Sequence, residues 1–477
     1  MSLASILEGR RPAGRLRRIA DAAARPVDVA SLAAFRIIFG LTMCGGILRF
    51  LGTGWIETMY GEPRWFFKYP GFAWVEPWSV RGMYIHYGVL AALALAIALG
   101  AFTRPALALF LAGFAYTQLV DVTNYLNHHY LAVLLGALLC ALPSNAAWSI
   151  DAWRRPALRR AVVPAWTVWL LRFQVGVVYV FAGLAKAKGD WLLGGQPLGL
   201  WLAARTEVPL FGPLLARPEA ALAMSWAGFL FDTTIVGWLS WARTRLAAYG
   251  AVLLFHGVTG YLFNIGMFPL IMSGAALIFF PPSWPRAALR RVGLGRLADL
   301  PPAAEAAGPP RLALPGRLGL ALIAAHVTVQ VALPLRHLAY PGPVLWNEDG
   351  MRFAWHVLVR EKHGAVTFVA VFADGKRLEV PARRYLTARQ EREMGGQPDL
   401  ILQLAHAIGR DLRARGYHGF RLHALTNVSL NGRPARPMID PDVDLLEVRD
   451  VGPRTWVLPA PDLPLPDLWR RRTQTPD

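Results

Sequence analysis

A lysine at the end of a long apolar segment is the first residue whose position could support chemistry. Lys186 closes the stretch 164–186, which is otherwise apolar enough to cross a bilayer. Burial disfavours the charged form of an amine, so a lysine inside a membrane cavity can be neutral and act as a base. A lysine near a helix end can instead lift its ammonium to the membrane surface. The spacing leaves both interpretations open, and it predicts an interfacial ion pair for the nearby Lys188 and Asp190.

A run of polar residues, 121–130, interrupts the apolar sequence between two further segments. It contains Asn127, the adjacent imidazoles of His128 and His129, and Tyr130. Neighbouring residues on a helix point about 100° apart, and a third ligand at a metal-like spacing is missing, so we expect no metal site. The run is then either a polar interfacial turn or part of a binding site.

Two more ionisable residues lie inside apolar segments, where such groups are costly and are functional candidates. His256 is one, although a histidine in this position is more commonly hydrogen-bonded within a bundle. Gly266 and Pro269 follow it and allow a helix to break, as backbone does where it lines a cavity at membrane depth. Asp232 is the other, and the sequence does not name its basic partner.

The composition excludes several classes of protein. Apolar residues make up 55% of the chain and charged residues 17%, whereas soluble domains carry roughly 25% charged residues. The formal net charge is +19, but the arginines lie between long apolar runs, which argues against a nucleic-acid partner. Cys44 and Cys140 lie in apolar runs and imply no disulfide framework. Dinucleotide, P-loop, CxxC and GxSxG motifs are missing.

Apolar stretches of about 20 residues, the length that spans a bilayer, recur between residues 31 and 335. We therefore expect a polytopic α-helical membrane protein with about eight or nine transmembrane helices. The stretches 246–262 and 264–281 have almost no linker between them and could form one broken helix. The candidate segments are 31–51, 83–103, 105–121, 129–146, 164–186, 219–240, 246–262, 264–281 and 315–335.

The basic residues predict the orientation of these segments. With nine spans, the arginine-rich stretches all fall on one side, and the positive-inside rule makes that side cytoplasmic. The first apolar run starts late and is of spanning length, which is typical of a signal-anchor. The arginine-rich stretches are 1–29, Arg104, Arg154–Arg160, Arg243–Arg245 and Arg286–Arg296. The long aromatic loops 52–82 and 187–218 would face outside.

The residues after the last predicted span, from 336 onward, show strand and turn patterns in place of long apolar runs. Asp374-Gly375 and Asn431-Gly432 each follow a β-rich run and predict hairpin turns, and the spacing over 398–415 predicts a helix. An odd number of spans makes this C-terminal, mainly antiparallel β domain extracytoplasmic. We expect a basic N-terminal cytoplasmic segment (1–29), a transmembrane catalytic domain (30–296), a Pro/Ala-rich linker (297–314), a last transmembrane helix (315–335) and a soluble, β-sandwich-like α+β domain with a C-terminal tail (336–477).

At these residues the chain resembles the vitamin K-dependent gamma-glutamyl carboxylase family in its bacterial form, with an HTTM-type membrane domain. One matching motif would carry little weight, but several occur in the family's order between about 30 and 450. The motifs are Ser31–Gly40, Asp121–Leu131, Tyr179–Trp191, Phe255–Phe268, Pro282–Arg286, Arg352–Trp355, the Asp374-Gly375 hairpin and Ile439–Asp444.

The resemblance implies an integral membrane enzyme, a carbon–carbon lyase or carboxylase. Such an enzyme oxidises vitamin K hydroquinone with O₂ to the 2,3-epoxide. The strong base so formed removes the γ-proton of a peptide glutamate, and the carbanion attacks CO₂. The resemblance places the hydroquinone-deprotonating base on Lys186, assisted by His128. It places Asn127, His128, Tyr130 and His256 at the quinone, in one polar pocket. It further implies contact with membrane lipid, an upstream quinone reductase, and a bacterial inner membrane.

This sequence departs from the animal members in places. Ala185 stands where they have a second lysine, and neither cysteine lies where their disulfide forms. Some bacterial relatives could perform only the epoxidation half of the reaction. Two alternatives to the carboxylase therefore stay open: a vitamin K or menaquinol epoxidase without a peptide substrate, and a non-catalytic quinone- or lipid-binding membrane protein.

Overall fold

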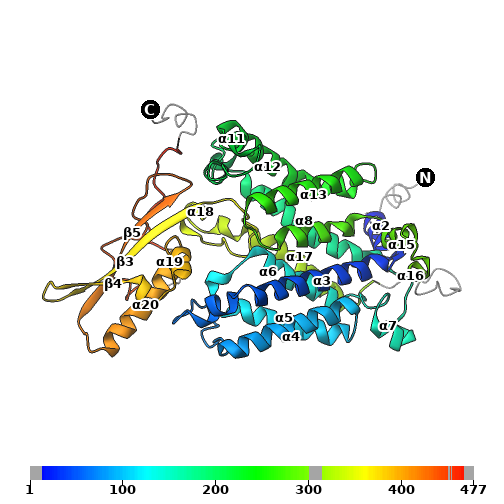
Figure 1. Cartoon of the computed structure of the whole chain (residues 1–477), viewed down its shortest axis with the longest axis horizontal. Coiled ribbons are helices and arrows are strands. Elements are labelled where there is room, and N and C mark those ends of the chain that lie inside the picture. The colour runs from blue at the N-terminus through cyan, green and yellow to red at the C-terminus, as the bar shows by residue number, and fades with distance from the viewer. Residues whose placement is uncertain (1–12, 300–313, 450–451, 453, 467–477) are drawn as a thin grey trace, which may run out of the picture.

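The computed structural model describes residues 13–299, 314–449, 452 and 454–466. An elongated helical bundle carries a smaller β-containing region at one end (Figure 1). Three predicted stretches lie partly outside the described residues: the start of the basic N-terminal segment, most of the linker 297–314, and the C-terminal tail.

The long helices of the bundle are apolar around most of their circumference, as membrane-spanning helices are. They therefore show little preference for one face. These helices are α3 (Ala30–Gly52), α4 (Val80–Leu99), α5 (Thr103–Leu119), α6 (Asn127–Ala141), α8 (Ala165–Lys186), α12 (Pro218–Ser240), α13 (Arg245–Leu262), α14 (Phe268–Ala276) and α17 (Arg317–Leu335).

Shorter elements connect these helices. The strands β1 (Pro26–Asp28) and β2 (Val162–Pro164) pair in a two-stranded antiparallel sheet, just before α3 and α8 begin. The short helices are α2 (Ala13–Ala24), η1 (Glu57–Gly61), η2 (Val122–Asn124), α7 (Ile150–Arg154), η3 (Pro156–Leu158), α9 (Gly189–Leu192), α10 (Leu198–Ala203), α11 (Gly212–Leu215), η4 (Leu277–Phe279), α15 (Trp284–Arg291), α16 (Gly295–Ala298), η5 (Arg336–Ala339) and α18 (Val344–Asn347).

Five helices within the described residues are long and apolar enough to cross a membrane: α3, α4, α8, α12, and α17 with its continuation to Ala339. The other four predicted segments also form helices (α5, α6, α13 and α14), but these are shorter or less apolar. The expected eight or nine spans are thus not confirmed. The predicted break between 246–262 and 264–281 is present, because α13 ends at Leu262 and Gly266 adopts a positive φ of 60° before α14.

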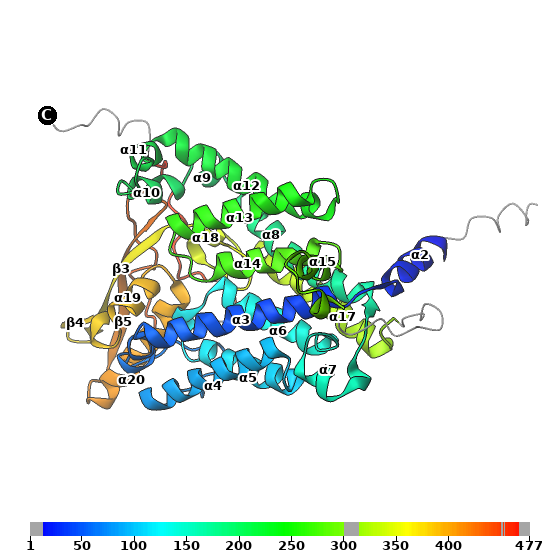
Figure 2. The ribbon, with the colours of Figure 1, turned by 45° about the vertical axis from the view of Figure 1, so that its right-hand side comes forward.

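The basic and the aromatic loops lie at opposite ends of the bundle. Figures 1 and 2 show α2, α7, α15 and α16 at the end away from the three-stranded sheet. The loop between α3 and α4 reaches the other end, where the Lys68 amide donates to Gln403 Oε1 at 3.0 Å. The segment after α8 reaches it too, through an ion pair of 2.7 Å between Asp190 and Arg433.

The β-containing region is one antiparallel sheet backed by a helix. The strands are β3 (Lys362–Phe372), β4 (Arg377–Pro381) and β5 (Phe420–Leu430), in the order β4-β3-β5. They confirm the Asp374-Gly375 hairpin. The predicted helix 398–415 is α20 (Pro398–Ala414), which packs its buried leucines against the sheet. Where the sequence suggested a sandwich, the described residues form this single sheet with α20, α19 (Ala388–Met394) and η6 (Ala382–Arg384).

A buried arginine holds helix ends together at the basic end of the bundle. Arg36 on α3 is fully buried and donates to the carbonyl oxygens of Ile97 (2.7 Å) and Ala98 (2.9 Å). These carbonyls belong to the last turn of α4, where intrahelical donors run out. The same guanidinium reaches the carbonyls of Ser144 and Trp148 after α6. One side chain therefore joins three parts of the chain.

Replacing Arg36 with leucine should destabilise the bundle, because the carbonyl oxygens of Ala98, Ser144 and Trp148 lose the donor that Arg36 supplies. Each such loss costs about 1–3 kcal/mol, so we expect the Tm of the detergent-purified protein to fall by at least about 5 °C. Arg81→Leu, at an exposed position near the start of α4, is the control and should leave the Tm nearly unchanged. An unchanged Tm for Arg36→Leu would contradict this account of the fold.

Candidate functional site

Lys186 and Asp232 form a buried ion pair between α8 and α12. Lys186 Nζ lies 2.8 Å from Asp232 Oδ2, and the two side chains are only 5% and 7% exposed. Lys186 also donates to the carbonyl of Ala182 one turn earlier, at 3.1 Å. The helices approach closely at Gly183, where a Cβ atom would lie 2.9 Å from the backbone nitrogen of Thr233. Asp232 thereby gains the basic partner that the sequence did not identify.

The ion pair borders a small cavity of about 60 Å³. His256 lies on another side of this cavity, and its Nε2 is 2.9 Å from the hydroxyl of Tyr179. Its Nδ1 is buried and has no hydrogen-bond partner among the described residues. The ring of Trp191 lies 5.3 Å from the Lys186 ammonium and contributes a cation–π contact. The cavity thus combines a charge pair with an imidazole in an otherwise apolar enclosure.

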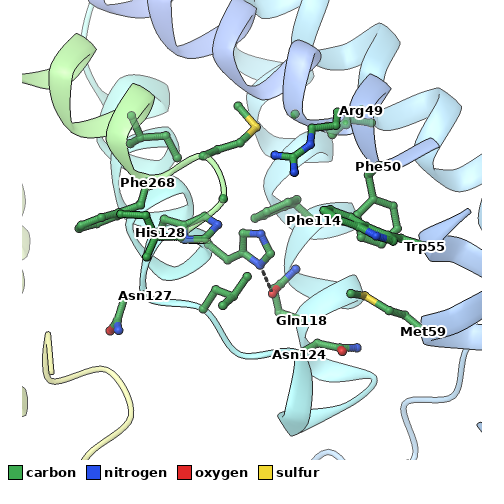
Figure 3. A pocket seen from close by; sticks show the side chains of 18 of the residues that line it. Arg49, Phe50, Trp55, Met59, Phe114, Gln118, Asn124, Asn127, His128 and Phe268 are labelled. Atoms are coloured by element: carbon green, nitrogen blue, oxygen red, sulfur yellow. Dashed lines mark hydrogen bonds between the residues drawn. The ribbon is translucent and has the colours of Figure 1, made fainter. Parts of the chain in front are cut away.

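A second, larger cavity of about 450 Å³ adjoins the first. Figure 3 shows His128 and Phe268 on one side of it and Arg49, Phe50 and Trp55 on the other. Polar residues of the predicted run line it as well. They include Asn127 and His129, whose Nδ1 is 2.8 Å from Gln118 Oε1, and Asn124, whose buried amide has no partner within the described part of the chain.

A wall that belongs to both cavities separates them. Phe268 is part of it, with its ring centroid 6.2 Å from those of both His128 and His256. The remaining wall residues are Ile265, Val357 and Leu358. The carbonyl of Val357 also accepts a hydrogen bond of 3.5 Å from Lys186 Nζ.

The segment after α18 that leads into Val357 and Leu358 of this wall has an unusual backbone. Phe353, Trp355 and Leu358 all adopt positive φ angles, between 55° and 63°. Bulky residues rarely do so, and each instance costs about 1–3 kcal/mol. The conformation is supported by a hydrogen bond of 2.8 Å from the Phe353 amide to the hydroxyl of Tyr125. Strain of this kind is characteristic of functional sites.

The structure distributes the predicted site residues over two cavities instead of one. Lys186 and His256 line the small cavity, whereas Asn127 and His128 line the large one. The two groups of residues lie in adjoining cavities with a shared lining, and the Phe268 ring lies 6.2 Å from the rings of both His128 and His256. Tyr130 lines neither cavity. Its hydroxyl accepts from Gln330 at 3.1 Å, and its ring stacks on Trp355 with centroids 5.1 Å apart.

The close partner of Asp190 among the described residues is Arg433, and Lys188 acts on the carboxylate only as a nearby positive charge. Both carboxylate oxygens of Asp190 accept from Arg433, at 2.7 and 2.8 Å, and one also accepts from Asn431. Burial alone would raise the pKa of Asp190, but these hydrogen bonds outweigh it and lower the pKa below its usual value. The carboxylate therefore attaches the segment after Lys186 to the turn that follows β5.

Several polar residues at the site were not singled out from the sequence, and Asn124 and Arg389 are two of them. Asn124 stood in the polar run 121–130 but was not assigned a role there. Arg389 comes from α19, where nothing in the sequence marks it, and it donates to the carbonyl and hydroxyl of Thr123 at 3.2 Å. Among the residues that the structure describes, no group of three His, Cys, Asp or Glu side chains could hold a metal ion.

The apolar helices of the bundle are those of a membrane protein, and its internal cavities are lined in part by the β-containing region. Comparison with protein families gives two matches: the HTTM domain over residues 24–284, and the lumenal domain of vitamin K-dependent gamma-carboxylase over residues 316–462. The chain therefore belongs to the vitamin K-dependent gamma-glutamyl carboxylase family, which confirms the resemblance found in the sequence. No solved structure matches the chain.

The contact between Asp190 and Arg433 predicts a pH-dependent stability. Because the folded-state pKa of Asp190 is lowered, its contribution is present above the unfolded pKa and lost as pH falls through the folded value. Asp190→Asn should lower the Tm at pH 7, and the difference from the unmodified protein should shrink below about pH 4. Thermal unfolding in detergent across pH measures this. A Tm difference that stays constant to pH 3 would contradict the assignment.

Proposed function

We propose that the protein is a vitamin K hydroquinone-dependent gamma-glutamyl carboxylase, which couples quinol epoxidation by O₂ to carboxylation of peptide glutamate. Membership of the family supports the reaction class. The observation that carries the proposal is the Lys186–Asp232 pair, buried inside the bundle and separated by a single wall from a larger amphipathic cavity. A buried amine beside a lipophilic pocket can accept a proton from a hydroquinone once it is neutral.

The large cavity suits a reduced naphthoquinone. Its volume of about 450 Å³ lies in the range of small-molecule pockets, roughly 300–1,000 Å³. Aromatic side chains such as Phe50 and Phe114 provide an apolar lining for a fused ring. The unpartnered amide of Asn124, together with Asn127 and His128, offers hydrogen bonds to a ring oxygen. When bound, the hydroquinone and O₂ would supply a base strong enough to remove the γ-proton of glutamate.

Asp232 gives Lys186 a way to change its protonation state. Burial disfavours both charges of the pair, and transfer of one proton within the pair removes both. We propose that Asp232 takes a proton from Lys186 Nζ and leaves a neutral amine, which then accepts the hydroxyl proton of the substrate. Asp232 acts here through Lys186 and is a positioning residue.

The wall between the cavities has to change when the substrate binds. Val357 and Leu358 separate Lys186 from the large cavity, and the carbonyl of Val357 already contacts Lys186 Nζ. We propose that an occupied large cavity displaces this strained segment and exposes the amine to the ring oxygen. Phe268 and Ile265 would remain as an apolar barrier that keeps water from the reacting groups.

The other predicted residues receive distinct roles in this proposal. His128 and Asn127 would hold the ring oxygen whose proton leaves. His256, fixed by Tyr179, would complete the polar lining near Lys186. Tyr130, which stacks on Trp355, would support the strained wall segment and would act on the quinone only through it.

The surroundings of the enzyme are part of the same proposal. The end of the bundle that carries α7 and α15 would face the cytoplasm of a bacterium, following the positive-inside rule. The β-containing region would then face outside the inner membrane and present a peptide glutamate to the site, while CO₂ enters as co-substrate. Membrane lipid would deliver the quinone, and a quinone reductase would regenerate its reduced form.

Lys186→Ala should abolish epoxide formation, because it removes the proposed base. The matched control is Lys188→Ala, two residues away and lining neither cavity, which should keep the activity of the unmodified protein. Both variants are assayed in nanodiscs with vitamin K hydroquinone and O₂, with epoxide quantified by liquid chromatography. Epoxide formation by a folded Lys186→Ala variant would place the base elsewhere.

Asp232→Asn should slow epoxidation about 10²-fold, since general-base assistance is worth about 10²–10⁴-fold and the amide cannot take a proton from Lys186. The KM for the hydroquinone should change little, because Asp232 does not line the large cavity. Asp232→Glu should recover part of the rate. An Asp232→Asn variant with an unchanged kcat would rule out this role for the carboxylate.

A further inference from the structure

A third cavity, of about 450 Å³, lies at the basic end of the bundle, where α6 ends and α5 begins. Neither the family assignment nor the proposed reaction uses it. Four exposed arginines line it, and none of the four forms an ion pair within the described part of the chain. These arginines are Arg104, Arg154, Arg155 and Arg160.

The acidic side chain that lines this cavity, Asp151, is already engaged. Its Oδ1 accepts from the Phe102 amide at 2.8 Å, and its Oδ2 accepts from the Thr103 amide at 2.8 Å and from Asn145 Nδ2 at 3.2 Å. Asp151 therefore caps the start of α5 and leaves the surrounding arginines without an acidic partner. The cavity carries an excess of positive charge that a ligand could neutralise.

The surroundings of the cavity are apolar and exposed. The guanidinium of Arg154 lies 5.0 Å from the ring of Phe102, which is 60% exposed, and the neighbouring Trp153 is 75% exposed. Further along α5, Leu109 is 61% exposed. Exposed aromatic residues beside arginines are typical of the level where lipid headgroups meet the hydrocarbon core.

We propose that this cavity binds the phosphate headgroup of an anionic glycerophospholipid, whose acyl chains lie along the exposed side of α5. Arginine is suited to phosphate because its planar group donates two parallel hydrogen bonds. Basic pockets between transmembrane helices are known to hold anionic headgroups. A free phosphate ion would use the arginines but not the apolar surface, so the combination favours lipid.

The test uses the full-length protein in mild detergent, with phosphatidylglycerol or phosphatidylcholine added and bound lipid counted by native mass spectrometry. The unmodified protein should retain phosphatidylglycerol in preference to phosphatidylcholine. Arg154→Gln with Arg155→Gln should weaken that retention at least about tenfold. The control, Arg291→Gln with Arg296→Gln, alters exposed arginines at the same end of the bundle and should retain lipid normally.

Two further arms make the outcome decisive. Arg154→Lys with Arg155→Lys keeps the charge and should recover much of the binding, which separates loss of the ligand contact from loss of the fold. Inorganic phosphate at millimolar concentration should not displace the lipid. Full displacement by phosphate would show a free-anion site and overturn the proposal, as would equal phosphatidylglycerol retention by the glutamine variant and the unmodified protein.

Discussion

Two opposite charges buried between the apolar helices α8 and α12 constrain the rest of this structure. Either Lys186 or Asp232 alone would be strongly unfavourable in an apolar bundle, and each is tolerated because the other lies 2.8 Å away. Such a contact requires α8 and α12 to be in close register, which Gly183 permits by admitting the backbone of Thr233. Lys186 is the last residue of α8, and from this position its amine reaches the small cavity.

The site is composite, because elements far apart in the chain enclose it. The broken connection between α13 and α14 contributes Ile265 and Phe268, and the segment before β3 contributes Val357 and Leu358. The bundle supplies the buried Lys186–Asp232 pair, and Val357 and Leu358 cover it from the other side. Positive φ angles at three bulky residues show that the fold holds this closing segment in a strained conformation. A site built in this way can exclude water and still open to a large ligand.

Much of the architecture could be predicted from local patterns. Apolar runs predicted the helices, Asp374-Gly375 predicted a hairpin, and a lysine at the end of an apolar stretch pointed to the amine that is buried beside Asp232. The remaining features depend on contacts between distant residues. Asp232 lies 46 residues from Lys186, and Arg389 lies 266 residues from Thr123, so no spacing rule joins either pair. The division of the pocket depends on where one aromatic ring, that of Phe268, packs.

The most direct test of the central claim measures the two products of one reaction together. Purified protein in nanodiscs receives vitamin K hydroquinone, O₂, ¹³C-bicarbonate and a glutamate-containing peptide, and mass spectrometry follows the epoxide and the labelled peptide. The account predicts epoxide together with ¹³C-labelled γ-carboxyglutamate. Epoxide without labelled peptide would contradict the carboxylase and favour the epoxidase. The absence of both products, from protein shown to be folded, would contradict either enzyme.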